Sequence, residues 1–244
     1  MGNAVLKILR TAAAVLAFSL AMRAQVFLKF EEVNLPVPDG SLLGVVDSHE
    51  VSGLPDGEIA SLQVWLELSE VGDGGYAGDL HIALWHDGAR AVLLNRPGRT
   101  AANGSGYSDT GDMDITLSAI ATGDLHLYRE VLGDSGTPLV GRLEGTWQAD
   151  GRDTDPLTVL DTDARTAGLG VFEGMDPNGI WALLAVDASS GGTVQLDSWG
   201  LMITPVPEPV ATVPAMAVGL VLWGCVRRRR TRCRPPVGPN AGRA

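Results

Sequence analysis

The sequence predicts an all-β protein, a sandwich of two sheets, with a separate apolar segment at each end of the chain. Short runs of alternating apolar and polar residues recur along the middle of the chain. Gly, Asp, Asn or Pro, which accept turn conformations, bound each run. No stretch between residues 26 and 204 has the three-to-four spacing of an amphipathic helix, so we expect few helices. Seven or eight strands at this spacing are typical of a sandwich.

The clearest strand is expected over residues 59–68. Leu62, Val64, Leu66 and Leu68 alternate there with polar or amphipathic residues, as in a half-buried strand. Six further runs have the same character and are also expected as strands: 79–85, 91–94, 114–117, 145–148, 180–186 and 193–203.

The N-terminal segment, residues 1–24, has the pattern of a secretory signal peptide. Lys7 and Arg10 precede an apolar run over 12–20, and the small residues Ala21 and Ala24 follow as cleavage sites. An apolar core of about ten residues at 1.5 Å each is too short to cross a hydrocarbon layer of roughly 30 Å. We therefore expect export, with signal peptidase as a processing partner.

The C-terminal segment has a different pattern. Pro207, Glu208 and Pro209 precede an apolar run over 210–226, and then come four arginines, Arg227, Arg228, Arg229 and Arg230. Seventeen residues span about 26 Å, enough for a thin bilayer, and the arginines orient the tail 231–244 toward the cytoplasm. We expect a transmembrane helix over 210–226, with a proline-rich junction that stays extended and open to a protease.

The order of these parts over residues 206–230 resembles a PEP-CTERM sorting signal, the exosortase substrate tag of Gram-negative bacteria. The tail 231–244 departs from that pattern, because such signals usually stop soon after the arginines. The resemblance implies an inner-membrane intermediate that an exosortase-like enzyme cuts near residues 207–209. The body would then be released or attached to surface exopolysaccharide, at the cell surface or outside the cell.

The charge of the body separates it from both ends. Residues 25–209 contain eight basic and 29 acidic side chains, for a formal charge of −21. Such a charge repels nucleic acid, which we exclude as a partner. Multivalent cations are the natural counter-ligand, and a merely solvated acidic surface is the alternative. Cys225 and Cys233 both lie beyond the body, so no disulfide crosses it.

Three stretches of the body resemble the P domain (P/Homo B domain) of proprotein convertases. These are the G-D-L-H-I-A-L run at 78–84 with its continuation to 94, the loop N-G-S-G-Y-S-D-T at 103–110, and the closing segment from Phe172 to Leu201. The resemblance covers residues 35–204 and implies a jelly-roll-like sandwich over residues 25–205. It departs from the family pattern at the turn 85–89 and in an acidic stretch at 150–163.

The function that this resemblance implies is non-catalytic. In convertases the P domain accompanies and stabilises a subtilisin-type protease, but this chain has no Gly-Thr-Ser nucleophile turn with His and Asp partners. We expect a cell-surface or matrix module associated with exopolysaccharide or biofilm. The alternative is an accessory domain that acts with a separately encoded subtilisin-like protease. Grouped acids with raised pKa would favour the alternative.

Calcium is the expected metal, because hard cations take carboxylate and carbonyl oxygens. The P-domain resemblance points most directly to Asp79 and Asp187, each at a strand end. Turn capping by these side chains is the competing interpretation, since no EF-hand loop is present. The further candidate ligands are Asp73, Asp109, Asp112 and Asp114.

The remaining polar and aromatic residues favour structural roles. His49, His81, His86 and His126 are scattered, which argues against zinc, and His81 is expected to point outward from a strand. The acidic run that contains Asp150 and Asp163 is expected to form a solvated, mobile loop. The tryptophans divide by position: Trp181 and Trp199 are expected in the core, and Trp85 is the best candidate for a surface role.

Overall fold

The computed structural model describes residues 25–54, 57–72 and 74–206. The predicted signal peptide, the sorting motif 207–209 with its arginines, the predicted span 210–226 and Asp73 lie outside these residues. Within the described residues, no helix combines the length and the apolar character that crossing a membrane requires.

One sheet has six strands. β1 (Val26–Phe30), β10 (Thr193–Pro205), β4 (Ile59–Val71), β7 (Met113–Ser118) and β8 (Leu143–Trp147) lie side by side in that order, and the short β2 (Leu35–Pro36) also pairs with β10. All pairs are antiparallel except β7 with β8, which run parallel.

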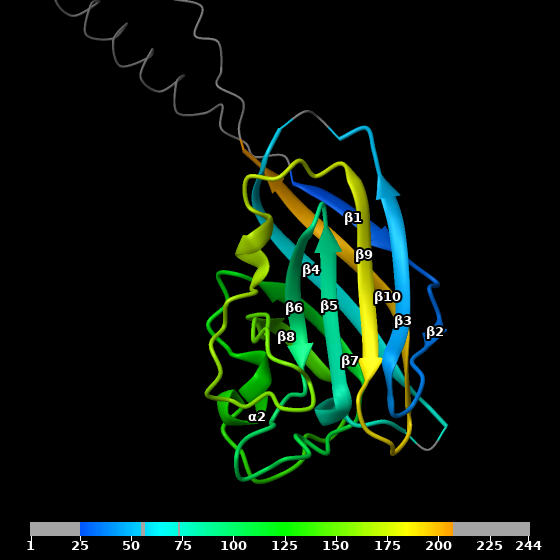
Figure 1. The fold of residues 1–244 in the computed structure, drawn as a ribbon, viewed down its shortest axis with the longest axis vertical. Coiled ribbons are helices and arrows are strands. Elements are labelled where there is room, and N and C mark those ends of the chain that lie inside the picture. Colours follow the sequence, from blue (N-terminus) through cyan, green and yellow to red (C-terminus); the bar gives the residue numbers. More distant parts are fainter. Residues whose placement is uncertain (1–24, 55–56, 73, 207–244) are drawn as a thin grey trace, which may run out of the picture. The chain divides into compact units, whose positions relative to one another are not determined.

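The other sheet has four antiparallel strands. They lie in the order β3 (Ser41–Val51), β9 (Gly179–Asp187), β5 (Leu80–His86) and β6 (Ala89–Asn95). Figure 1 shows this sheet in front of the six-stranded one. The helices described are short: η1 (Ala77–Asp79), η2 (Leu125–Leu127), α2 (Tyr128–Val131) and η3 (Leu169–Phe172). The prediction of an all-β, two-sheet sandwich is confirmed, and all seven predicted strands are present.

The core lies between the two sheets. On β4 the alternating residues Leu62, Val64, Leu66 and Leu68 are buried, as their period of two predicted. Trp181 and Trp199 are both fully buried, which confirms their predicted place in the core. Fully burying one large apolar side chain stabilises the fold by about 1.5–3 kcal/mol. Because one continuous cluster of these residues lies inside residues 25–206, this body can fold on its own.

The two ends of the sandwich differ in what they hold. Val26 of β1 pairs with Ile203 of β10, so Gln25 and Val206 lie at the same end. Leu80, the first residue of β5, pairs with Asp187, the last residue of β9, at the opposite end. Figure 1 shows β1 and the last part of β10 at one end, and the last residues of β9 at the other.

The acidic stretch at 150–163 matches the solvated loop that we expected only in part, because Asp153 and Asp155 are exposed whereas Asp150 is buried. Asp150 is fully buried and accepts hydrogen bonds from the backbone N–H of Asn95 and from the His126 ring. Arg152, also buried, donates to both Asp150 and Asp124. The prediction was wrong for Asp150 because it counted acids alone, whereas Arg152 neutralises this carboxylate inside the fold.

His81 also differs from expectation. It lies on β5 but is only 6% exposed. Its Nδ1 lies 3.1 Å from the Asn95 side-chain oxygen, and the Asn95 amide donates to the carbonyls of Arg152 and Thr154. The outer face of β5 is therefore not exposed to solvent at His81.

Candidate functional site

The structure brings together the two acids that the resemblance singled out. Asp79 ends the 3₁₀ helix η1, and Asp187 ends β9. Pairing of Leu80 with Asp187 sets the two acids next to each other, and the Ala188 N–H donates to the Asp79 backbone carbonyl at 2.8 Å. Asp79 is 7% exposed and Asp187 is 1% exposed. We call these two residues the acid pair.

Arg96 is the basic partner of the acid pair. It follows β6 directly and has a positive φ of 51°, which turns its side chain back over the end of the sheet. Its Nε donates to the Gly78 carbonyl at 2.8 Å, and its Nη2 donates to the Asp79 carboxylate at 3.0 Å. Asp79 is therefore partly neutralised, whereas no basic residue of the described ranges lies within ion-pair distance of Asp187.

The electrostatics of the site disfavour the ionised acids. Burial raises the pKa of Asp187 to about 6, with the nearby charges of Asp79 and Asp39 acting in the same direction. Burial also raises the pKa of Asp79, although Arg96 opposes that rise. At neutral pH the fold therefore holds two crowded carboxylates, and a cation beside them would relieve their repulsion.

A pocket of about 240 Å³ opens beside Asp79, one member of the acid pair. Asp79, Ser189 and Ser190 line one part of it, and Tyr76 and the segment 105–108 line the rest. The close approach of this segment requires glycine at position 78, because a Cβ there would lie 2.6 Å from the backbone nitrogen and oxygen of Tyr107. The pocket is therefore built around a fixed backbone contact.

The oxygen atoms at the acid pair are of the kind that a hard cation binds. Asp79, Asp187 and the Ser189 hydroxyl supply oxygen, the ligand atom that calcium prefers. Within the described ranges, no three His, Cys, Asp or Glu residues cluster closely enough to form a metal site by themselves. Calcium takes six to eight oxygens, so backbone carbonyls and water would have to complete its shell here.

The other predicted calcium ligands lie apart from the acid pair. The Asp109 carboxylate accepts two hydrogen bonds from Arg129, at 2.7 and 2.8 Å, and another from the Tyr128 hydroxyl. Asp112 accepts from the Glu70 N–H at 2.7 Å, and Asp114 accepts from the Trp65 indole at 2.8 Å. These three residues act as ion-pair and hydrogen-bond partners, and Asp73 lies outside the described residues.

The four histidines each bond to a different part of the fold. His49 lies 2.7 Å from the Asp47 carboxylate, and His126 lies 2.8 Å from that of Asp150. His86 stacks on Trp181 with ring centroids 3.9 Å apart, and both its ring nitrogens face carbonyl oxygens. Together with the hydrogen bond of His81 to Asn95, these contacts account for every histidine as a structural residue.

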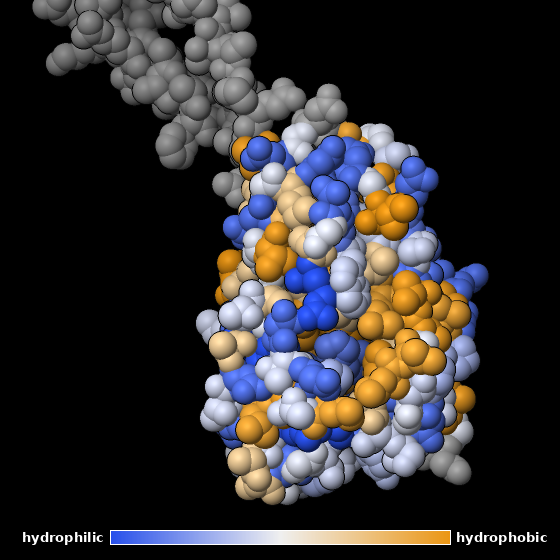
Figure 2. Space-filling model, viewed as in Figure 1, coloured by the Kyte–Doolittle hydropathy of each residue, from blue (hydrophilic) through white to orange (hydrophobic). Residues whose placement is uncertain are grey.

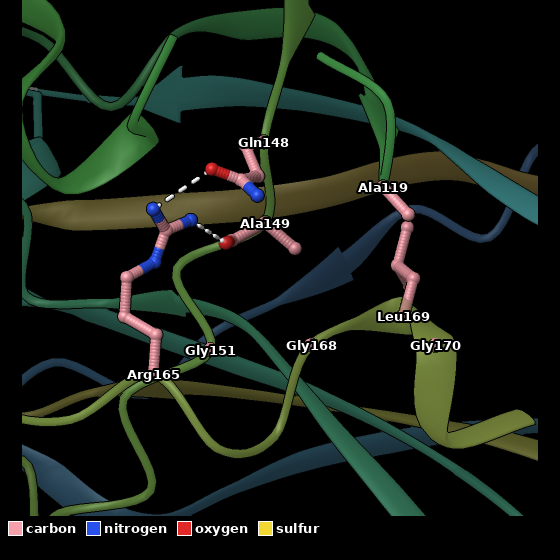
Figure 3. A pocket seen from close by; sticks show the side chains of 8 residues that line it. All are labelled: Ala119, Gln148, Ala149, Gly151, Arg165, Gly168, Leu169 and Gly170. Atoms are coloured by element: carbon pink, nitrogen blue, oxygen red, sulfur yellow. Dashed lines mark hydrogen bonds between the residues drawn. The ribbon is translucent and has the colours of Figure 1, made fainter. Parts of the chain in front are cut away.

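A second pocket, of about 180 Å³, lies beside Arg165 (Figure 3). Its guanidinium donates to the side-chain oxygen of Gln148 and to the carbonyls of Ala149 and Asp150, at 2.6 to 2.8 Å. Each of its three nitrogens therefore has a partner within the protein. The acid pair, whose charges are not balanced, is the stronger candidate site.

Sequence reasoning found the acid pair but missed the residues around it. Arg96, Ser189 and Tyr107 were not predicted as site residues. Arg96 carries one usable signal, since it is one of eight basic residues in a strongly acidic body and directly follows a predicted strand. The approach of the segment 105–108 depends on tertiary contacts and has no local signal.

Comparison with known proteins identifies no family for this chain. No family model matches it, and no curated protein sequence matches it. Solved structures with some similarity include the serine protease of Aeromonas sobria, alone (TM-score 0.39) and in complex with its chaperone (TM-score 0.40). Each match has 15% sequence identity, covers 81% of this chain and covers 30% of the other chain. This chain thus corresponds to less than a third of those proteins.

Proposed function

We propose that this protein is an exported, non-catalytic module of the cell surface or extracellular matrix, and that calcium bound at the acid pair stabilises it. The observation that carries the proposal is the crowding of Asp79 and Asp187, whose ionised forms are disfavoured in a protein with few basic residues to balance them. Buried like charges at a pocket destabilise the empty protein and favour a bound cation.

Sequence features outside the site support the proposed fold and the proposed location at the cell surface. The resemblance to P domains supports a jelly-roll-like form of the sandwich. The predicted signal peptide and PEP-CTERM-like segment favour export, processing by an exosortase-like enzyme and association with exopolysaccharide. Calcium is available outside cells at millimolar concentration, which suits a weak site of this kind.

The calcium proposal is tested by calorimetric unfolding of residues 25–206 with calcium and with chelator. At a hundredfold excess over Kd, a ligand bound only to the folded state adds about 2.7 kcal/mol, which raises Tm by several degrees. We expect this rise in the wild type and in the control Asp87→Asn, which changes an exposed turn residue. We expect no rise in Asp187→Asn. An equal rise in all three proteins, or none in the wild type, would contradict the proposal.

The sorting proposal is tested by the mass of the mature protein. The full chain is expressed in a host with an exosortase, and its ends are read by mass spectrometry. We expect an end near Ala21 or Ala24 and another within 207–209, and accumulation of the longer form when Arg227 to Arg230 are replaced by alanine. A secreted wild type that retains its C-terminal residues would contradict exosortase processing.

A second function is favoured by the same acid pair. Grouped acids with raised pKa are typical of hydrolase sites and of their degenerate relatives. The chain would then act as an accessory domain for a separately encoded subtilisin-like protease. The test adds the body to such a protease that lacks a domain of this kind and measures the half-life of activity. A longer half-life without any calcium effect on the body would favour this second function.

A further inference from the structure

Strand β3 has a free edge. Within β3 (Ser41–Val51), Ser41 and residues 45–51 pair with β9 on one side, and no other part of the described chain bonds to the backbone of this strand. The edge strand on the other side of this sheet, β6, is covered, since Val92 exchanges backbone bonds with Ala167 and Gly151. A long free edge offers unpaired N–H and C=O groups to another strand.

Apolar side chains are exposed beside this free edge. Leu42 is 50% exposed, Leu43 is 89% exposed and Val46 is 59% exposed. Figure 2 shows apolar residues gathered over the side of the molecule where β3 and β9 lie. The pairing register breaks between Ser41 and Val45, so the intervening residues do not pair with β9.

We propose that a second copy of this chain pairs with β3 edge to edge, antiparallel, with Ser48 on the two-fold axis. In this register Ser48 faces its counterpart, Val46 faces Glu50, and Asp47 faces the second copy's His49. The dimer would join two four-stranded sheets into one continuous sheet. This dimer goes beyond the proposed function, and its formation does not depend on that function.

The pattern of charges along β3 selects this register. In an antiparallel pair, residues that face each other must lie on the same face of the sheet. The two-fold axis of the dimer must therefore pass between a residue and its own counterpart, and not between two neighbouring positions of the sequence. An axis at Asp47 would set two aspartates against each other, which is destabilising. An axis at His49 would set two histidines together and leave Asp47 opposite Val51. An axis at Val46 would require ladder pairing by residues 42–44, where the register breaks.

The axis at Ser48 instead forms two complementary pairs. The Asp47 side chain is 19% exposed and the His49 side chain is 35% exposed, and they already lie 2.7 Å apart within one chain. Both lie on the inner face of β3, where Asp47 also accepts a hydrogen bond from the Trp199 indole, and the Ser48 register would continue this row of alternating Asp47 and His49 side chains into the second copy. The aliphatic part of Glu50 faces Val46 on the outer face, where both residues are exposed.

Cysteine cross-linking tests the register directly. Residues 25–206 contain no native cysteine, so only introduced thiols can react. Under mild oxidation we expect Ser48→Cys to form a disulfide-linked dimer by itself. Val46→Cys and Glu50→Cys should each stay monomeric alone and should cross-link when the two proteins are mixed. Thr116→Cys, in the other sheet, is the control that should not cross-link.

The association itself is tested by light scattering across a concentration series. We expect the wild-type mass to double as concentration rises. Val46→Asp would set two carboxylates opposite each other, at positions 46 and 50, and should weaken dimer formation about tenfold or more. Added salt should strengthen the dimer, because it screens the repulsion between two acidic bodies. A mass that stays monomeric, or self-linking of Val46→Cys in the absence of Ser48→Cys linking, would overturn the proposal.

Discussion

At the scale of single residues, burial sets the behaviour of the acids more than their number does. Asp109 is almost completely buried, yet Arg129 and Tyr128 hold its carboxylate in place. Asp187 is buried to the same degree, no arginine of the described residues forms an ion pair with it, and burial raises its pKa to about 6. Two aspartates that look alike in the sequence therefore lie in different surroundings.

Replacement of Asp187 by asparagine should stabilise the calcium-free protein at neutral pH. A raised carboxyl pKa means that this group contributes stability below pH 4, and the contribution is lost as pH rises toward 6. Asp187→Asn removes the ionised form and should raise the free energy of unfolding at pH 7.5 by about 2 kcal/mol, with little gain at pH 4. Denaturant unfolding in chelator measures both values. A loss of stability at pH 7.5 would show that the carboxylate is needed for hydrogen bonding.

His126 gives the fold a second pH dependence. Its two ring nitrogens face the Asp150 carboxylate at 2.8 Å and the Arg99 carbonyl at 2.9 Å, an arrangement that requires both ring protons. Burial opposes the charged ring, but the hydrogen bond and charge of Asp150 prevail and raise its pKa. The stability it contributes is complete below pH 6.5 and is lost as pH rises through the raised value.

We expect His126→Gln to cost about 3 kcal/mol at pH 6, because it leaves Asp150 buried without its charged partner. The cost should shrink toward pH 9, where the wild-type ring has itself lost a proton. Unfolding titrations at the two pH values measure the difference. His49→Gln, at a part-exposed ring, serves as a control, and a pH-independent cost in His126→Gln would contradict a charged His126.

At the scale of elements, the sequence predicted strands wherever the alternation was regular. The seven predicted runs became β4 to β10. The prediction missed β1, β2 and β3. For β3 this failure has a physical reason. Its inward positions include Asp47, which accepts a hydrogen bond from the Trp199 indole, and His49, which stacks on Phe30. Polar residues on the core side destroy the pattern on which the prediction depends.

The acid pair was predictable only in part for a similar reason. Asp79 and Asp187 each end an element, which a sequence can indicate. Their meeting depends on the register between β5 and β9, and their pKa values depend on burial. Neither Arg96 nor Tyr107 carries a local signal for its contact with Gly78, because those contacts join segments that only tertiary structure brings together.

Gly44 permits the irregular start of β3, and its replacement should destabilise the protein. It has a positive φ of 59°, and a Cβ there would overlap the carbonyl oxygen of Ala185 on β9. Gly44→Ala should lower the free energy of unfolding by about 3 kcal/mol. At Gly104 a Cβ would meet no atom within 4 Å, so Gly104→Ala should change the free energy of unfolding by less than about 0.5 kcal/mol. Equal values for the two variants would show that β3 shifts to accommodate the methyl group.

At the scale of the whole body, repulsion among acids is the dominant long-range force. Residues 25–206 contain eight basic and 28 acidic side chains. Salt screens such repulsion, with a Debye length that falls from about 30 Å at 0.01 M to about 10 Å at 0.1 M. We expect Tm to rise by several degrees between these concentrations of NaCl, in a dilute sample, and by the same amount in KCl. A falling Tm would mean that local ion pairs such as Arg129 with Asp109 outweigh the net repulsion.

The arrangement of the chain ends also determines how the body bears mechanical load. Gln25 and Val206 lie at one end of the sandwich and the acid pair at the other, and the 13 residues of β10 reach about 40 Å along it. A pull between Val206 and a ligand at the acid pair runs parallel to the strands. The β4–β10 hydrogen bonds then resist in shear, all at once, whereas a pull between Gln25 and Val206 peels β1 from β10 one pair at a time. The body therefore resists a pull between Val206 and the acid pair more strongly than a pull between its two chain ends.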